Sequence, residues 1–205
     1  RPAPRVGEHG GAVAWPPRGR SAPRGKPRLP LEGLRILDLT AWWAGPAATH
    51  MLAALGADVI HVESIQRPDG MRFGTLAPPG SELWWERGPT FHSANTGKRS
   101  LTLDLSRPEG RELLLRLASA CDVLVENLPD DARARWGCRY EDLAALNPSL
   151  VVVSVSCYGR TGPYSARSGA GTLAEAFAGL THMTGDAAGP PGLASGALGG
   201  PGSRG

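Results

Sequence analysis

The side chains that could bind or activate a ligand gather in four stretches of this sequence, each of which follows an apolar segment. These stretches are residues 41–46, 64–70, 127–135 and 157–164. The first contains the adjacent pair Trp42-Trp43, and the third contains Asn127 and two arginines. Tryptophan offers a flat apolar face, and arginine binds phosphates in a fixed geometry. An adjacent aromatic pair cannot turn both rings inward from a strand end, so we expect at least one ring to face a cleft.

The sequence lacks the motifs that mark NAD-binding, P-loop, metal and redox sites. No GxGxxG opens the first helical segment, which disfavours an NAD enzyme, and no GxxxxGK[ST] is present, which excludes a P-loop. We interpret four histidines as structural because they lack metal-ligand spacing: His50, His61, His92 and His182. The three cysteines form no CxxC, so we expect structural thiols in a reducing cytoplasm.

The elements that must position these stretches follow from the apolar pattern. Strands are predicted at residues 34–40, 59–63, 98–105, 122–126 and 150–156. Helices are predicted at residues 47–55, 113–121, 141–146 and 172–180. Ser106 and Glu109 have the spacing of a capping box before the second helix. The continuous apolar run of the last strand is typical of the centre of a parallel sheet.

Strands that alternate with helices predict an α/β fold with a Rossmann-like, doubly wound parallel sheet and right-handed crossovers. In such sheets ligands bind beyond the carboxyl ends of the strands. The four stretches named above lie at these ends, so the fold itself predicts a binding site there.

Composition and charge set the boundaries of this domain. The chain has 205 residues, of which 41% are apolar and 20% charged, as in globular proteins. No apolar run is long enough to span a bilayer, so we expect no membrane partner. Residues 1–30 carry a charge of +6 and the remainder −3, so the basic character belongs to a Pro/Gly/Arg-rich segment that we expect to be disordered. Because this segment lacks interleaved aromatics, we expect a solvated linker rather than a nucleic-acid partner.

Six segments in order carry a resemblance to a known family. They are LEGLRILDLT-x3-AGP, LGADVIHVE, NTGKRSLTLDLSRPEGRELL, CDVLVEN, YEDLAALNPSLVVVSVSCYGRTGPY and AGLTHMTG. Over residues 31–199 the chain resembles the family III CoA-transferases of the CaiB/BaiF type. The resemblance implies the first portion of a Rossmann-like large domain, in a family whose members are about twice this length and form interlocked homodimers. Residues 200–205 would then be a Gly-rich tail outside the resemblance.

The resemblance implies coenzyme A as substrate and a set of residues that contact it. Trp43 stands where formyl-transferring relatives place an active-site glutamine, with Trp42 and Ala44 beside it. Leu103 and Asp104 match a stretch that lines the nucleotide, Asn127 matches the asparagine of a VEN motif, and Arg135 matches an arginine that contacts CoA. Lys98 and Arg99 either contact a phosphate or flank an edge strand. Arg135 could instead belong to a solvated face, and Asn127 could be a turn residue.

The residue expected to perform the chemistry is absent from its place. The resemblance implies an aspartate that attacks the acyl-CoA thioester, about nine residues after a Gly-Pro-Pro turn. Gly189-Pro190-Pro191 is present, but Gly200 stands at the aspartate's position. The His-Asp pair of racemising relatives is also missing, since Ala170 and Gly171 occupy its place, which argues against racemase chemistry. We therefore expect no catalytic residue and no metal in this chain.

Two functions remain open from the sequence. The first is a cytoplasmic CoA-transferase that moves CoA between an acyl-CoA and a carboxylic acid in a full-length parent, with this chain inactive alone. The second is a non-catalytic subunit that binds CoA or a protein partner. The acyl donor and acceptor, and the choice among truncation, a frame shift and half of a tandem protein, do not follow from the residues.

Overall fold

The computed structural model describes residues 2–11, 29–74, 78, 80–185 and 188–192. The chain divides into two compact units, Arg1–Ser154 and Val155–Gly205, and each is described by itself. The stretch 31–199, which we expected as one domain, extends into both units. Residues 12–28 and 200–205, which we expected to be a disordered segment and a tail, lie outside the described residues.

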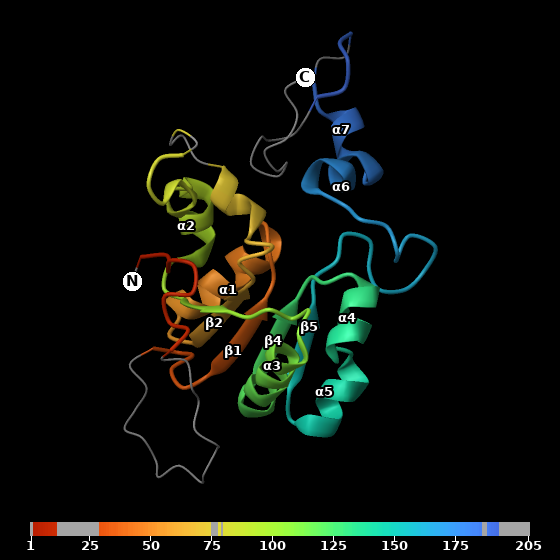
Figure 1. Ribbon diagram of the computed structural model, residues 1–205. Coiled ribbons are helices and arrows are strands. Elements are labelled where there is room, and N and C mark those ends of the chain that lie inside the picture. Colours follow the sequence, from red (N-terminus) through yellow and green to blue (C-terminus); the bar gives the residue numbers. More distant parts are fainter. Residues whose placement is uncertain (1, 12–28, 75–77, 79, 186–187, 193–205) are drawn as a thin grey trace. The chain divides into compact units, whose positions relative to one another are not determined.

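A five-stranded parallel sheet organises the first unit (Figure 1). Its strands are β1 (Arg35–Leu39), β2 (Asp58–Glu63), β3 (Arg99–Thr102), β4 (Val123–Glu126) and β5 (Val151–Ser154). Their order is β3-β2-β1-β4-β5, and every neighbouring pair is parallel. Each strand overlaps a segment that the apolar pattern predicts, so the predicted doubly wound sheet is confirmed.

The helices that connect the strands form two groups (Figure 1). In the first group, α1 (Ala44–Ala54) packs against α2 (Pro89–Asn95), and in the second, α3 (Pro108–Ala120) packs against α5 (Tyr140–Leu146). The crossovers from β1 to β3 run in one direction along the sheet and those from β3 to β5 in the other. Right-handed connections therefore place the two groups on opposite faces. The remaining elements of this unit are α4 (Asp130–Trp136) and the 3-10 turns η1 (Gly70–Phe73) and η2 (Trp84–Glu86).

The core of this unit lies between the sheet and the helices α3 and α5, and buried side chains from both layers build it. Leu37 of β1, Ile60 of β2 and Leu124 of β4 are fully buried, and Leu114 of α3 packs onto them. At fully buried leucine or isoleucine positions a truncation to alanine costs about 2–5 kcal/mol. The sheet is thus a rigid base for the loops at its edge.

Two local expectations are wrong. Ser106 does not cap α3, since the helix begins at Pro108 and the Ser106 hydroxyl donates instead to Asp104 Oδ1. Proline favours the first position of a helix because its fixed φ suits the helical backbone and because it has no N–H to satisfy. Pro108 therefore moves the start of α3 past the predicted cap.

Strand β5 lies at the edge of the sheet rather than at its centre, with Val151 and Val153 largely exposed.

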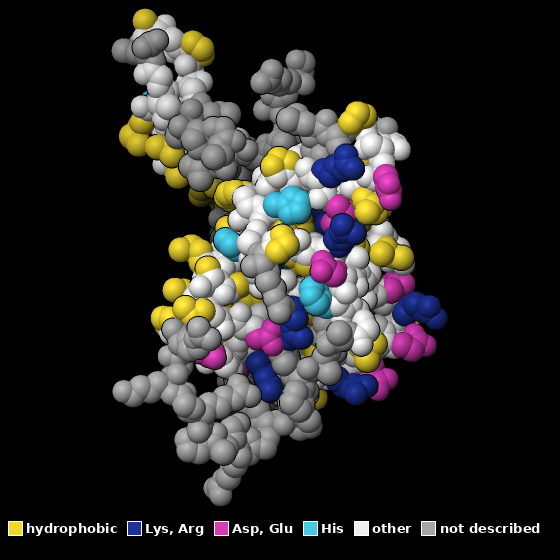
Figure 2. All heavy atoms as spheres, turned by 90° about the vertical axis from the view of Figure 1, so that its left-hand side faces the viewer, with side chains coloured by type: hydrophobic (Ala, Val, Ile, Leu, Met, Phe, Trp, Pro, Cys, Tyr) yellow, Lys and Arg dark blue, Asp and Glu magenta, His cyan; other side chains and the backbone are white. Residues whose placement is uncertain are grey.

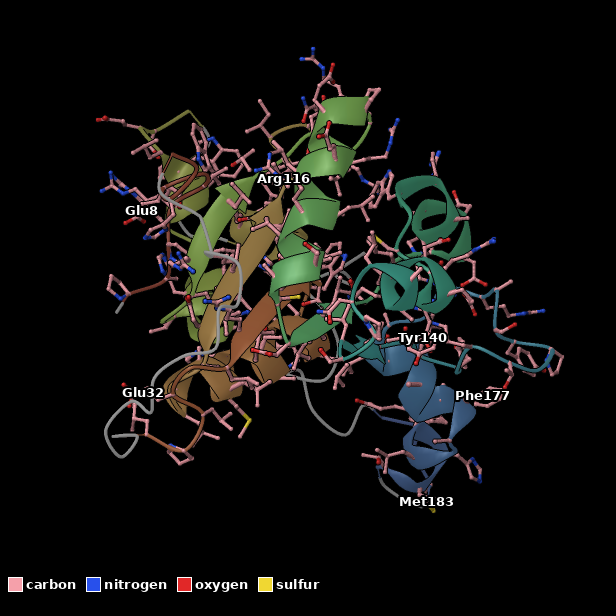
Figure 3. All side chains as sticks on the ribbon, turned by 90° about the horizontal axis from the view of Figure 1, so that it is seen from below. Glu8, Glu32, Arg116, Tyr140, Phe177 and Met183 are labelled. Atoms are coloured by element: carbon pink, nitrogen blue, oxygen red, sulfur yellow. The ribbon has the colours of Figure 1, made fainter. Side chains whose placement is uncertain are left out.

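The segment 2–11 lies along the opposite edge strand, β3. The backbone N–H of His9 donates to Ser100 O at 3.0 Å, and the Ser100 N–H donates to His9 Nδ1 at 3.1 Å. Ala3 packs on Met71 and Phe91. Residues 2–11, which belong to the segment 1–30 that we expected to be disordered, thus make defined contacts with the first unit. Glu8, labelled in Figure 3, marks this segment at the sheet edge far from Tyr140 of α5.

The surface carries charges of both signs. On the face shown in Figure 2, the basic and acidic side chains of the described residues lie interspersed rather than in a patch of one sign. In the part of the chain that the structure describes, no helix has the length and apolar character of a membrane-spanning segment.

The second unit contains α6 (Gly171–Phe177) and α7 (Leu180–Met183). Tyr158 and Tyr164, from the stretch 157–164, pack their rings on Phe177 of α6 at centroid distances of 5.3 and 5.2 Å. The guanidinium of Arg167 lies over the Tyr164 ring at 5.1 Å. The unit is thus held by an aromatic cluster, and it begins directly after β5.

Candidate functional site at the carboxyl edge of the sheet

The strand order creates a switch point between β1 and β4. These neighbours are parallel, and the chain leaves them in opposite directions, so a crevice for a ligand is expected at their carboxyl ends. Asn127 bridges the two loops that meet there: its Nδ2 donates to Ala41 O at 2.8 Å, and its Oδ1 accepts from Ala41 N at 3.1 Å. Asn127 therefore holds the loops after β1 and β4 together, and its predicted contact with a ligand stays a prediction.

The loop after β1 presents two tryptophans to solvent. Trp42 is 56% exposed and Trp43 is 40% exposed, so both residues of the pair are accessible to solvent. Trp42 has φ +70°, a backbone conformation that side chains other than glycine rarely adopt. Its N–H donates to Asp69 Oδ1 at 3.0 Å. Ala44 then begins α1, whose first turn has no side-chain cap.

A buried charged cluster lies beneath this loop. Asp38 of β1 is fully buried and accepts from Lys98 Nζ at 2.9 Å and from the hydroxyls of Thr40 and Thr49 at 2.6 Å each. The ring of His61, its register partner on β2, lies with Nδ1 3.2 Å from Asp38 Oδ2. Burial alone would raise the pKa of Asp38, but the Lys98 ammonium, His61 and Thr40 outweigh it and hold that pKa well below its usual range.

A second buried ion pair supports the loop after β2. The guanidinium of Arg72, fully buried, donates to both oxygens of Glu63 at 2.9 and 2.6 Å and to Glu86 Oε2 at 2.7 Å. Burial would raise the pKa of Glu63, but its hydrogen bonds from Arg72 dominate and keep it below its usual value. The same carboxylate accepts the N–H of Asp69 at 3.0 Å. The ion pair thus fixes the residue that holds Trp42.

The carboxyl end of β3 adds Leu103 and Asp104. Leu103 is buried, and its N–H donates to Glu63 O at 2.9 Å. Asp104 is near the surface and accepts from the N–H and hydroxyl of Ser106, hydrogen bonds that lower the pKa of Asp104. Gln66 Nε2 lies 3.4 Å from Asp104 Oδ2, which joins the loops after β2 and β3. Both predicted residues therefore lie at the same edge as the tryptophan pair.

The predicted cations lie in different places. Arg135, on α4, is exposed and pairs with Asp131 at 2.8 Å. Lys98 is buried, and its ammonium also donates to Pro46 O and Asn95 Oδ1, at 2.8 Å each. Arg99 opens β3 at the opposite end of the strand and forms a bidentate pair with Asp58 at 2.8 and 2.6 Å. The structure thus does not bring Lys98 and Arg99 to the crevice, and their phosphate contact stays a prediction.

Sequence reasoning missed the supporting residues. An aspartate inside the apolar run 34–40 and a histidine inside 59–63 were visible signals, because a strand buried on both faces tolerates a charge only with a partner. Arg72 gave no such signal in its loop-rich segment. No group of three or more potential metal ligands comes together among the residues that the structure places. The position of Gly200 lies outside those residues.

Comparison with known proteins gives a consistent result. The family model described as "CoA-transferase family III" matches residues 31–199. The chain is 40% identical over 167 residues to the succinyl-CoA–D-citramalate CoA-transferase of Chloroflexus aurantiacus, covering 81% of this chain and 40% of that protein. It is 39% identical over 163 residues to the succinyl-CoA–L-malate CoA-transferase alpha subunit of the same organism, covering 78% of this chain and 37% of that protein.

A solved structure shows the same fold. The crystal structure of a CaiB/BaiF family protein from Brucella suis matches with a TM-score of 0.74 at 38% identity. The match covers 82% of this chain and 44% of that one. The chain therefore spans about two fifths of the length of the relatives it matches.

Proposed function

Because the chain belongs to CoA-transferase family III, we propose that it is the CoA-binding portion of an enzyme that moves coenzyme A between an acyl-CoA and a carboxylic acid. The main support for the proposal is that the family model matches residues 31–199. These residues include β1 and β4, the neighbouring strands whose carboxyl ends form the proposed crevice. Coenzyme A would lie across this carboxyl edge, where doubly wound sheets bind their ligands.

The chemistry of the edge supports a CoA site. Coenzyme A carries an adenine and three phosphate groups, which require apolar faces and hydrogen-bond donors. Trp42 and Trp43 supply exposed aromatic surface, and Ala44 and Gly45 supply backbone N–H groups in the first turn of α1, which has no side-chain cap. We assign Leu103, Asp104 and Asn127 to the walls of the crevice.

The exposure of each predicted cation decides whether we propose that it contacts a phosphate of CoA. Arg135 is the most exposed cation of the predicted set, so we propose that it exchanges Asp131 for a phosphate of CoA. Lys98 and Arg99 support the sheet in this proposal. An ammonium that already has three acceptors within 2.9 Å, as Lys98 has, gains little from a further anion.

The reaction of the parent enzyme requires a nucleophile. An aspartate would attack the acyl-CoA carbonyl to form a mixed anhydride and release the CoA thiolate, which then attacks the aspartyl carbonyl to form an aspartyl-CoA thioester and free the first acid. The acceptor carboxylate would complete the exchange by the same steps in reverse. Gly200 has no side chain that could make the first nucleophilic attack, so we propose that the chain as it stands binds CoA without turnover.

Calorimetric titration of coenzyme A into the chain tests the binding site. We expect binding in the wild type and a Kd that is higher by about tenfold after Trp43→Ala, since an aromatic contact is worth about 1 kcal/mol or more. Trp85→Ala is the matched control because it removes an exposed tryptophan from η2 instead. Equal effects of the two substitutions, or no binding by the wild type, would reject the site.

An exchange assay tests the absence of turnover. The purified chain would be incubated with succinyl-CoA and a labelled dicarboxylate, since the relatives compared above are named for succinyl-CoA. We expect no labelled CoA ester. Acyl exchange by this chain would show that another residue replaces the aspartate.

A second candidate function is a non-catalytic subunit. The name of one relative, an alpha subunit, favours an enzyme built from two different chains. The partner would then be a second chain that carries the nucleophile, whereas a homodimer is expected for full-length relatives. Native mass spectrometry of this chain alone separates the two: a homodimer favours the first arrangement, and a CoA-binding monomer favours the second.

A further inference from the structure

We propose that Asp69 and Gly70 are positioning residues for the Trp42 loop, so that CoA binding depends on two residues that need not touch CoA. This inference rests on the proposed CoA site at the carboxyl edge. It adds that the shape of that site is set by the loop after β2 as well as by the loop after β1.

Asp69 fixes the backbone of Trp42. One carboxylate oxygen, Oδ1, accepts the N–H of Trp42 at 3.0 Å and the N–H of Met71 at 2.9 Å. Asp69 is 3% exposed, so water cannot easily replace either bond. The φ of +70° at Trp42 is costly for a residue with a Cβ and persists only where its surroundings enforce it. The hydrogen bond from Asp69 is such an enforcement.

Gly70 fixes the side chain of the same tryptophan. A Cβ at Gly70 would lie 2.4–2.7 Å from three carbons of the Trp42 six-membered ring, far inside van der Waals contact. The ring therefore lies directly against the Gly70 backbone while more than half of the residue stays exposed. Glycine leaves room for this close approach, and alanine would displace the ring.

The loop after β2 is itself anchored deep in the fold. The N–H of Asp69 donates to Glu63 Oε1 at 3.0 Å, and Arg72 binds the same carboxylate through two nitrogens. The Arg72 guanidinium lies 3.6 Å from the centre of the Phe91 ring. A continuous set of contacts thus runs from the end of β2 to Trp42. The tryptophan is held from below by a rigid part of the molecule.

The test is a set of calorimetric CoA titrations on folded variants of the full chain. We expect Asp69→Ala to raise the Kd by about tenfold, as the loss of a buried hydrogen bond would. Asp69→Asn keeps an oxygen acceptor and should remain within about twofold of wild type. Asp122→Ala is the matched control, because that carboxylate accepts the Arg35 N–H at 2.9 Å at the opposite end of β1. Equal Kd values for Asp69→Ala and Asp122→Ala would overturn the role of Asp69.

Gly70 is tested through a double-mutant cycle with Trp42. Gly70→Ala should raise the Kd by about tenfold when Trp42 is present and should have no further effect in a Trp42→Ala background. Equal effects in both backgrounds would show that Gly70 acts on folding alone and would overturn its role.

A second readout separates this inference from the CoA proposal. Amide hydrogen exchange at Trp42 should be slow in the wild type and in Asp69→Asn, and faster in Asp69→Ala. If the wild type fails to bind CoA, the proposed function falls, and the exchange rate still decides whether Asp69 holds the loop. Unchanged exchange in Asp69→Ala would refute the positioning role.

Discussion

Replacing Lys98 by methionine removes an ammonium group that lies 2.9 Å from Asp38 Oδ2 in the interior of the sheet. The change leaves Asp38 as a buried carboxylate without the Lys98 ammonium and removes one hydrogen-bond donor from each of Pro46 O and Asn95 Oδ1. Methionine fills a similar volume, so the effect reports the charge rather than a cavity.

The magnitude follows from the partners that remain. Removing one member of a buried ion pair costs about 3–5 kcal/mol. Asp38 keeps hydrogen bonds from Thr40 and Thr49, and His61 stays within 3.2 Å, so we expect a loss near 3 kcal/mol, at about the lower end of that range. For a chain of this size the midpoint of thermal unfolding should fall by about 6–12 °C.

Urea unfolding followed by circular dichroism measures this loss. Arg99→Met is the matched control, because the adjacent cation pairs with Asp58 near the surface and should cost less than about 1 kcal/mol. The double variant Asp38→Asn/Lys98→Met should recover part of the stability, since it leaves no uncompensated charge.

The outcome distinguishes two roles for Lys98. A cost below about 1 kcal/mol, equal to that of Arg99→Met, would refute a buried pair. A raised Kd for CoA at unchanged stability would then favour the phosphate contact that the sequence leaves open for Lys98.

Three further predictions concern groups outside that pair. Burial, with the charges of Glu126 and Asp142, raises the pKa of Cys138 to about 12, so Cys138 should resist iodoacetamide at pH 8 while the exposed Cys157 is alkylated, as peptide mass spectrometry can check. Burial raises the pKa of the Asp69 carboxyl in the folded protein above its value in the unfolded chain. The stability that Asp69 contributes is therefore fully present below the unfolded-state pKa and is lost as the pH rises through the folded-state pKa. Asp69→Asn should remove that pH dependence from urea midpoints measured across the acidic range, and an unchanged slope would contradict it. Deleting residues 1–11 should lower the free energy of unfolding by about 1–3 kcal/mol, because several hydrogen bonds to β3 and η2 and the burial of Ala3 are lost.

The sequence was sufficient to predict the sheet and the edge where the site lies. Apolar runs predict all five strands, and their alternation with helices predicts the parallel arrangement. The same pattern places the stretches 41–46 and 127–135 after β1 and β4, and Ala41 and Asn127 meet at the switch point. The helix α4 inside the second stretch was not predicted. These features depend on local periodicity, which a single sequence contains.

The supporting contacts could not be predicted in the same way. Asp38 and His61 become neighbours only through the register of β1 on β2, and Lys98 reaches Asp38 from sixty residues away. Arg72 is buried within the segment 64–97, which forms η1, η2 and α2 although its sequence has no periodic signal. The burial of Lys98 beside Asp38 follows from these long-range contacts.

Strand β5 has a consequence for handling the protein in solution. Within the described residues β5 pairs only with β4, and its valines at 151 and 153 are exposed. Unpaired backbone groups beside exposed β-branched side chains form a template for another extended chain. The protein should therefore become turbid with rising concentration, and a soluble peptide that adds a sixth strand should act as an assembly inhibitor.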